Sequence, residues 1–211
     1  MWEYLMRKTL AALSLLSASL LTTNALANNT FEATDIFDLE YASSPQLSPD
    51  GAKVVYIRNS NDIMTDNKNR NLWLIDTKTQ TQLPLFSDDK QYSQPRWSPD
   101  GKKVAFVSNL SGSWQIHVHY LEQNRTALVS QLQTGISGLT WSPDGKWLAF
   151  SQRVKDKQTK LASMPAKPKG AKWAKPVIVI DKAYYQRDGQ GLVKPGYDHI
   201  FVIPSEGGTP R

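Results

Sequence analysis

Two histidines, His117 and His119, come closest to a metal site by residue type and spacing. They lie two positions apart in the run QIHVHY, so on a β-strand their imidazoles would share one face. A structural zinc site takes four ligands, and the sequence offers no obvious third donor near this pair. We therefore expect an ordinary strand surface at these histidines, and neither a metal nor a cofactor in this chain.

Other candidate catalytic and binding groups also lack partners. Asp62 and Asp66 stand in a polar stretch without the Asp/Asn/Gly spacing of a calcium loop. The string GISG at 135–138 lacks the G-x-S-x-G spacing of a nucleophile elbow. The chain has no cysteine, which removes a thiol nucleophile and any disulfide framework. It also contains neither a G-x-G-x-x-G string nor a P-loop. We expect no catalytic residue and no cofactor-binding residue.

The sequence does repeat a turn. The segments 45–59, 95–109 and 139–153 read PQLSPDGAKVVYIRN, PRWSPDGKKVAFVSN and LTWSPDGKWLAFSQR, with a spacing of 44 to 50 residues. In each copy Pro presets φ, Asp favours the next turn position, Gly can take positive φ, and Ser can accept a backbone N–H. The predicted structural turn residues are Ser48, Pro49, Asp50, Gly51, Ser98, Pro99, Asp100, Gly101, Ser142, Pro143, Asp144 and Gly145. The three aspartates are thus explained as turn formers.

Short apolar runs follow each turn, and a second strand–turn–strand piece follows each run. KVVYI, KVAFV and WLAFS are rich in β-branched and aromatic residues, which suits strands buried on both faces. Segments 71–85, 114–129 and 199–211 supply the second hairpins. Trp97 and Trp141 precede two of the turns. We expect them to pack between repeats, with stacking on a ligand as the alternative. Four strands per period of this length indicate propeller blades.

We therefore predict an all-β fold, a partial β-propeller of about three four-stranded blades over residues 45–211. The blades span about 45–90, 91–135 and 136–211, and the third carries an insertion at 154–198. Within the insertion Asp188-Gly189 signals a hairpin turn and hence an extra ribbon. The last strand of the third blade should start at 209–211. Closed propellers have about 4 to 8 blades, and an open arc exposes apolar faces. We expect the front part of a longer protein or the product of a disrupted gene.

The charge and the first residues bear on location and partners. The formal net charge is +6, and much of the excess lies in the basic run 153–175. Such a run can bind nucleic acid or an anionic membrane surface, but we favour a solvated loop and no nucleic-acid partner. Residues 1–27 have a basic pair, an apolar run and a small-x-small end, as in a secretory signal peptide. We expect an exported, periplasmic or secreted protein with a lead-in segment at 28–44 and no stable membrane insertion.

The chain resembles the start of exported prolyl oligopeptidase-type serine peptidases, in the acylaminoacyl-peptidase and dipeptidyl-aminopeptidase-like branch. TDIFDLEYASSPQLSPDGAKVVYI and PRWSPDGKKVAFVSN carry the resemblance, and the phrase PVIVIDKAYYQRDGQGLVKPGYDHIFVIPSEGGTPR makes it more specific. The resemblance implies a propeller that limits the access of short peptides to an α/β-hydrolase domain with a Ser, Asp and His triad. No position here matches a triad residue, so the catalytic domain is expected to be absent from this chain.

Two other interpretations remain. A non-catalytic periplasmic propeller, similar to that of the Tol system, would bind protein partners. Against it, the first blade starts within about twenty residues of the predicted cleavage site, which leaves no room for the α/β domain that precedes the Tol propeller. A module that closes a ring with its own copies is the other interpretation, although a break inside a blade disfavours it.

Overall fold

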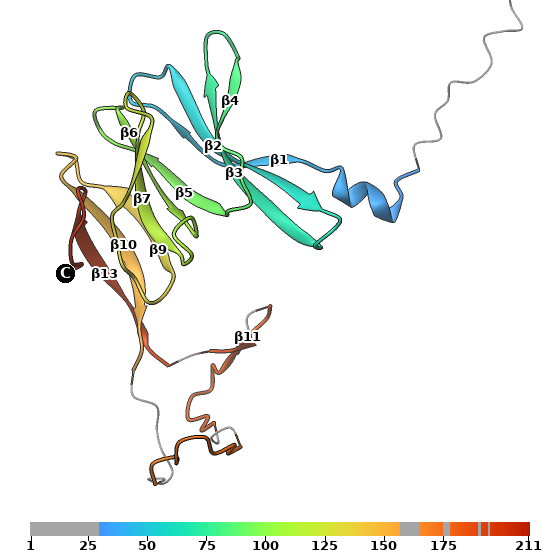
Figure 1. Cartoon of the computed structure of the whole chain (residues 1–211), viewed down its shortest axis with the longest axis vertical. Helices are drawn as coiled ribbons and strands as arrows, with labels where there is room; N and C mark the ends of the chain where they lie inside the picture. Colours follow the sequence, from blue (N-terminus) through green and yellow to red (C-terminus); the bar gives the residue numbers. More distant parts are fainter. Residues whose placement is uncertain (1–29, 157–164, 175–177, 190, 194) are drawn as a thin grey trace, which may run out of the picture. The chain divides into compact units, whose positions relative to one another are not determined.

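The computed structural model describes residues 30–156, 165–174, 178–189, 191–193 and 195–211 (Figure 1). The predicted signal peptide at 1–27 lies outside these residues. Contacts divide the chain into two units, one ending at Ile36 and one from Phe37 to Arg211. A 3₁₀ helix, η1 (Ala33–Phe37), comes first, and the other elements found in the described residues are strands. No helix in the described part of the chain is long and apolar enough to cross a membrane. The predicted all-β class is confirmed.

Two antiparallel four-stranded sheets form the first two blades. Each sheet takes its strands in sequence order, β1-β2-β3-β4 and β5-β6-β7-β8. The first strand begins four residues before the expected start of the blade. The strands of the first sheet are β1 (Tyr41–Leu47), β2 (Lys53–Asp62), β3 (Asn67–Asp76) and β4 (Gln82–Phe86), and those of the second are β5 (Tyr92–Trp97), β6 (Lys103–Ser108), β7 (Gln115–Tyr120) and β8 (Arg125–Leu128).

The third sheet has three complete strands, in the order β13-β10-β9, and its last strand was predicted only to start at 209–211. These are β9 (Ile136–Trp141), β10 (Trp147–Val154) and β13 (Tyr197–Pro204). Arg211 exchanges two backbone hydrogen bonds with Val202, at 2.9 and 3.0 Å, and so occupies the place of a fourth strand beside β13. The predicted ribbon consists of β11 (Gln186–Arg187) and β12 (Gly191–Leu192), which pair around the Asp188-Gly189 turn. The partial propeller is confirmed.

Two apolar clusters lie between consecutive sheets. We call the side of a sheet that faces the next sheet along the chain its forward face. Val55 and Ile57 of the first forward face pack with Val104 and Phe106 of the second sheet. Between the second and third sheets lies the other cluster, which contains Ala105, Val107, Ile116, Val118, Leu148 and Phe150. Because β6 contributes to both clusters, its residues from Val104 to Ser108 are all buried.

The forward face of the third sheet lies open, as expected of an open arc of blades. Ile200 pairs with Ser151 in the third sheet. The residues at the equivalent position of the strand pairing are Ile116 in the second sheet and Leu72 in the first. Ile116 and Leu72 are fully buried, whereas Ile200 is 81% exposed. The difference arises because no described sheet packs against the third. Leu47, which stands where the other repeats have tryptophan, is 60% exposed on the opposite face of the first sheet.

The insertion leaves and rejoins the third sheet at one narrow neck. Val154 and Tyr197 are the terminal pair of the β10–β13 ladder, and the backbone of Asp156 donates to Pro195 at 3.4 Å. Gly196 adopts a φ of 136°, and a β-carbon at this position would collide with the carbonyl oxygen of Val154. Only glycine at position 196 therefore allows the backbone to approach Val154 this closely.

Replacing Gly196 with alanine is expected to open this neck and to destabilise the protein by about 1–3 kcal/mol, because the backbone conformation and the collision both oppose a side chain. Amide hydrogen exchange at Val154 and Tyr197 should become faster. Gly170→Ala is the matched control, since Gly170 also has a positive φ, 83°, but open space around it. If both variants lose the same free energy of unfolding, the close contact between Gly196 and Val154 does not explain the effect.

Candidate functional site

The three SPDG segments adopt one turn geometry. In each copy the glycine N–H donates to the serine carbonyl at 2.9 Å, and the glycine φ is 69–71°. Ser48 Oγ donates to Asp50 at 2.6 Å and accepts the Lys53 N–H at 2.9 Å. The other two turns repeat both bonds at 2.5–2.9 Å. Each turn is therefore closed by its own four residues and by the start of the next strand.

The same hydrogen bonds determine the charge of the turn aspartates. The serine hydroxyl is the largest cause that lowers the pKa of Asp50, Asp100 and Asp144, and a backbone N–H two residues later adds to it. A carboxyl group that is held ionised in this way cannot serve as a general acid near neutral pH. The turn aspartates are thus anions whose carboxylates close the turns.

Successive turns and their tryptophans connect the blades. A β-carbon on Gly101 would lie 3.6 Å from Pro49 of the preceding turn, and one on Gly145 would lie 3.7 Å from Pro99. Trp97 Nε1 donates to the Gln46 carbonyl of the first sheet at 2.9 Å. Trp141 Nε1 donates to the Arg96 carbonyl of the second sheet at 3.0 Å. Each tryptophan therefore packs between two blades, and its indole hydrogen bond links the first strand of its own blade to the first strand of the preceding blade.

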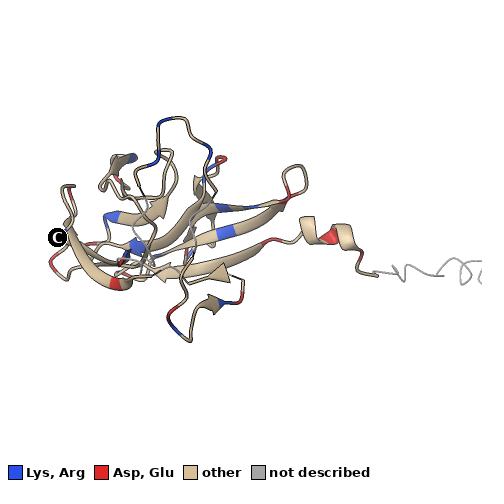
Figure 2. Ribbon diagram, turned by 90° about the horizontal axis from the view of Figure 1, so that it is seen from below, with Lys and Arg blue, Asp and Glu red and all other residues tan. Residues whose placement is uncertain are grey.

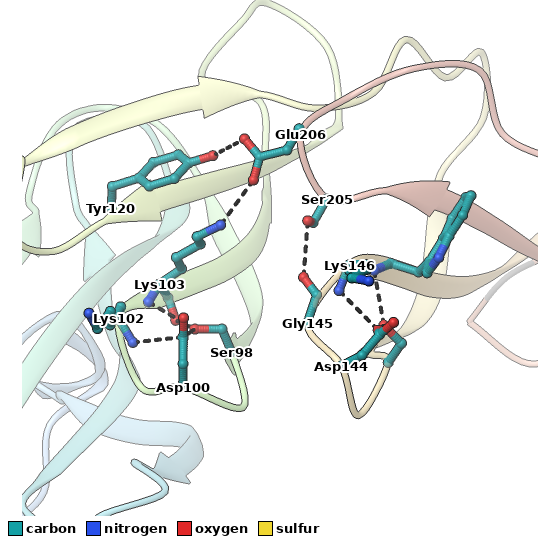
Figure 3. A network of polar contacts seen from close by, with 12 residues as sticks. Ser98, Asp100, Lys102, Lys103, Tyr120, Asp144, Gly145, Lys146, Ser205 and Glu206 are labelled. Atoms are coloured by element: carbon teal, nitrogen blue, oxygen red, sulfur yellow. Dashed lines mark hydrogen bonds and ion pairs between the residues drawn. The ribbon is translucent and has the colours of Figure 1, made fainter.

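A polar cleft of about 560 Å³ lies between the second and third turns (Figure 3). Glu206, in the turn after β13, accepts from Lys103 and from Tyr120 at 2.9 Å each. The Lys103 hydrogen bond is the main cause that lowers the pKa of Glu206, and it raises the pKa of Lys103 in turn. Ser205 Oγ donates to the Gly145 carbonyl at 3.0 Å. These contacts join the third blade to the second, and no sequence signal identified Glu206.

The inner strands β1, β5 and β9 contact one another and carry a feature that sequence reasoning missed. Four residues before each turn serine the backbone has a positive φ of 52–67°, at Ser44, Gln94 and Gly138. The ladder of each inner strand is interrupted at this point by a bulge. A serine that recurs immediately before each of these positions, Ser43, Ser93 and Ser137, is the signal that could have revealed the bulge.

Gln94, which lies at the bulge of β5, forms hydrogen bonds with the third blade. Its side-chain amide donates to the Ile136 carbonyl at 3.2 Å and accepts the Leu139 N–H at 3.1 Å. Both partners lie in β9, so the amide bridges two inner strands across the β9 bulge. The bridge therefore links the first strands of the second and third blades.

Gln94→Ala is expected to lower the free energy of unfolding by about 1–3 kcal/mol, because two backbone groups of β9 lose their partner. Gln94→Gly removes the same bonds but relieves the left-handed backbone, so it should be less destabilised than the alanine variant by about 1 kcal/mol. Urea denaturation of the three proteins measures both differences. An alanine variant as stable as the original would show that the bridge contributes nothing.

His117 and His119 do not lie on an ordinary strand surface, so that expectation was wrong. Each is only 3% exposed, between the first and second blades. The His117 ring stacks on Phe106 with centroids 5.6 Å apart, and His119 meets the edge of Phe86 at 5.3 Å. Burial lowers the pKa of both imidazoles. Among the described residues no group of three or more His, Cys, Asp or Glu side chains could hold a metal ion.

Asp62 and Asp66 also have local structural roles. Asp62 accepts the Met64 N–H at 2.9 Å and the Thr65 hydroxyl at 2.8 Å, and these bonds lower the pKa of its carboxyl group. Asp66 takes a left-handed φ of 50° in the same hairpin loop. Within the described segments these contacts hold turns and blades together, and His119 Nδ1 lies 3.0 Å from the Thr126 hydroxyl inside the blade interface.

The chain is similar to propeller-containing peptidases. The profile of the PD40 family, the TolB beta propeller domain, matches residues 33–173. The "Uncharacterized peptidase YuxL" of Bacillus subtilis (strain 168) is 27% identical over 180 residues, which are 85% of this chain and 27% of that protein. Acylaminoacyl peptidase of Pyrococcus horikoshii aligns with a TM-score of 0.61 at 19% identity, over 81% of this chain and 24% of its own.

A second solved structure, acylaminoacyl peptidase in complex with Z-Gly-Gly-Phe-chloromethyl ketone, aligns with a TM-score of 0.63 at 20% identity, over the same shares of the two chains. The resemblance to the propeller region of prolyl oligopeptidase-type peptidases is thereby confirmed. The chain spans about a quarter of the length of these relatives.

Proposed function

Because this chain belongs to the TolB beta propeller domain family, we propose that it forms the first blades of a larger propeller, which limits the access of short peptides to the active site of a serine peptidase. The catalytic α/β-hydrolase domain of that peptidase would lie outside this chain. The similarity to a peptidase and to acylaminoacyl peptidases supports this assignment.

The open forward face of the third sheet is the observation that carries the proposal. The positions equivalent to Ile200 and Val202 are filled in the second blade by Ile116 and Val118, which are fully buried by the third. A fourth blade would bury Ile200 and Val202 in the same way. Exposed apolar sheet faces of this kind favour association, so a following blade also protects the chain from aggregation.

In this proposal the chain restricts access because its blades form a rigid wall. The inner strands form part of the wall around the propeller axis, and the Gln94 bridge, the two tryptophan bonds and the Glu206 ion pair hold adjacent blades at a constant spacing. A wall that cannot widen admits a short peptide and excludes a long chain, whether that chain is folded or unfolded. The alternative is a propeller without catalysis that binds protein partners, as the Tol system does.

Reading the encoding DNA past the codon for Arg211 tests the proposal first. We expect a continuation, in frame or restored by one frameshift, that encodes further SPDG hairpins and a G-x-S-x-G segment. Unrelated sequence at that place would overturn the assignment to a peptidase and leave the partner-binding alternative.

The gating step has its own test on the longer protein. We expect it to cleave short peptide amides, and to cleave a long unfolded protein far more slowly. Equal rates on the two substrates would contradict gating even if the protein is a peptidase.

A further inference from the structure

The insertion between Val154 and Tyr197 carries more than the whole net charge of the chain. Residues 155–196 contain nine lysines and one arginine against three aspartates, a net charge of +7. The rest of the chain has 15 basic and 16 acidic residues, a net charge of −1. On the blades the two signs are interspersed (Figure 2). The positive charge is therefore a property of this one excursion.

The same excursion exposes large apolar and aromatic side chains. Its exposed fractions range from 44 to 60% for Trp173, Ile178, Ile180, Tyr184, Tyr185 and Leu192. The β11–β12 ribbon pairs only two residues on each strand. Ile178, Ile180, Tyr184, Tyr185 and Leu192 line one open cavity of about 480 Å³ instead of a closed core. Lys167, Lys169 and Lys172 lie exposed in the segment that leads to Trp173. Apolar groups gathered in this way mark an interaction surface.

The excursion is not needed to build the blade. The β10–β13 ladder continues without interruption from Trp147 opposite Pro204 to Val154 opposite Tyr197. A short hairpin turn could therefore replace everything between Val154 and Tyr197. The segment of about forty residues is both basic and rich in apolar side chains.

We propose that this basic–aromatic patch, consisting of Lys167, Lys169, Lys172, Trp173 and the exposed apolar residues of segment 178–192, binds the surface of an anionic lipid bilayer. Lysines attract anionic headgroups while aromatic and aliphatic side chains enter the interfacial region. Protein–protein interfaces are depleted in lysine, which disfavours a protein partner. Nucleic-acid sites favour arginine, of which the excursion has one against nine lysines. The patch thus combines the two features of peripheral membrane binding.

Co-sedimentation of the purified chain with lipid vesicles tests this proposal. We expect binding to vesicles of phosphatidylcholine mixed with phosphatidylglycerol, little binding to pure phosphatidylcholine, and release by salt. The triple variant Lys167→Glu, Lys169→Glu, Lys172→Glu should bind about a hundredfold more weakly, since each lysine near an anionic surface contributes about fivefold. Trp173→Ala should bind about tenfold more weakly.

The matched control is Lys68→Glu, Lys78→Glu, Lys146→Glu, which makes the same change in net charge at exposed lysines of the blades. It should bind vesicles as the original chain does, and circular dichroism should show that both triple variants remain folded. Equal loss in the two triple variants, or equal binding to neutral and mixed vesicles, would overturn the proposal. Tighter binding to polyglutamate than to mixed vesicles would also overturn it, in favour of an acidic protein partner.

Discussion

Replacing Phe106 with alanine is expected to lower the free energy of unfolding by about 3–5 kcal/mol, the usual cost of removing a fully buried phenylalanine. Phe106 has no exposed surface. The centroid of its ring lies 5.3 Å from the ring centroid of Phe86 in the first blade, and 5.6 Å from those of Tyr92 and His117. The truncation leaves a cavity at the centre of the interface between two blades. Rigid aromatic neighbours on both sides prevent that cavity from collapsing.

Urea denaturation, monitored by circular dichroism, measures this loss. Phe31→Ala is the control, because Phe31 is 70% exposed and its truncation should change stability by less than about 0.5 kcal/mol. If Phe106→Ala proves as mild as Phe31→Ala, the interface between the first and second blades does not contribute to the stability of the chain.

Acidification through the pH range below 6.5 is expected to destabilise the protein because of its two buried histidines. Burial lowers the pKa of His117 and His119 below the ordinary value of 6.5. The unfolded chain therefore binds protons at these sites before the folded chain does. Their contribution to stability is complete above pH 6.5 and is lost as the pH falls toward the lowered folded values. The carboxyl groups with lowered pKa, such as Asp100, act in the same direction but at more acidic pH.

The urea midpoint between pH 5 and 7.5 measures the effect. His117→Phe combined with His119→Phe should remove most of the pH dependence above pH 5 while keeping aromatic packing next to Phe106 and Phe86. His199→Gln, at an exposed position of β13, is the matched control for the replacement of a histidine. A double variant that loses stability on acidification as steeply as the original would show that other groups are responsible.

The turns were predictable in detail because their interactions are local. Ser48 bonds to Asp50 two residues away and to Lys53 five residues away, and the same spacing recurs at Ser98 and Ser142. The residues needed for these bonds all stand in the repeated string, so no knowledge of the rest of the chain is required. The Asp188-Gly189 turn of the ribbon was identified for the same reason.

The histidines show where such reasoning ends. Strand alternation places His117 and His119 on one face, but their surroundings depend on what packs against that face. The residue that packs against His119 is Phe86, which lies more than thirty residues earlier in the chain. Likewise, Gln94 is an unremarkable polar residue in the sequence, and it becomes a bridge only because β9 lies beside β5.

The sequence by itself determined the all-β class, the repeated turns, the ribbon and the resemblance to peptidase propellers, since these depend on short-range bonds and on a pattern that recurs in the chain. Tertiary structure alone decided the inter-blade contacts of Gln94 and Glu206, the burial of the histidines and the exposure of Ile200. Those properties depend on which sheet packs against which, and packing between sheets joins residues that are tens of positions apart.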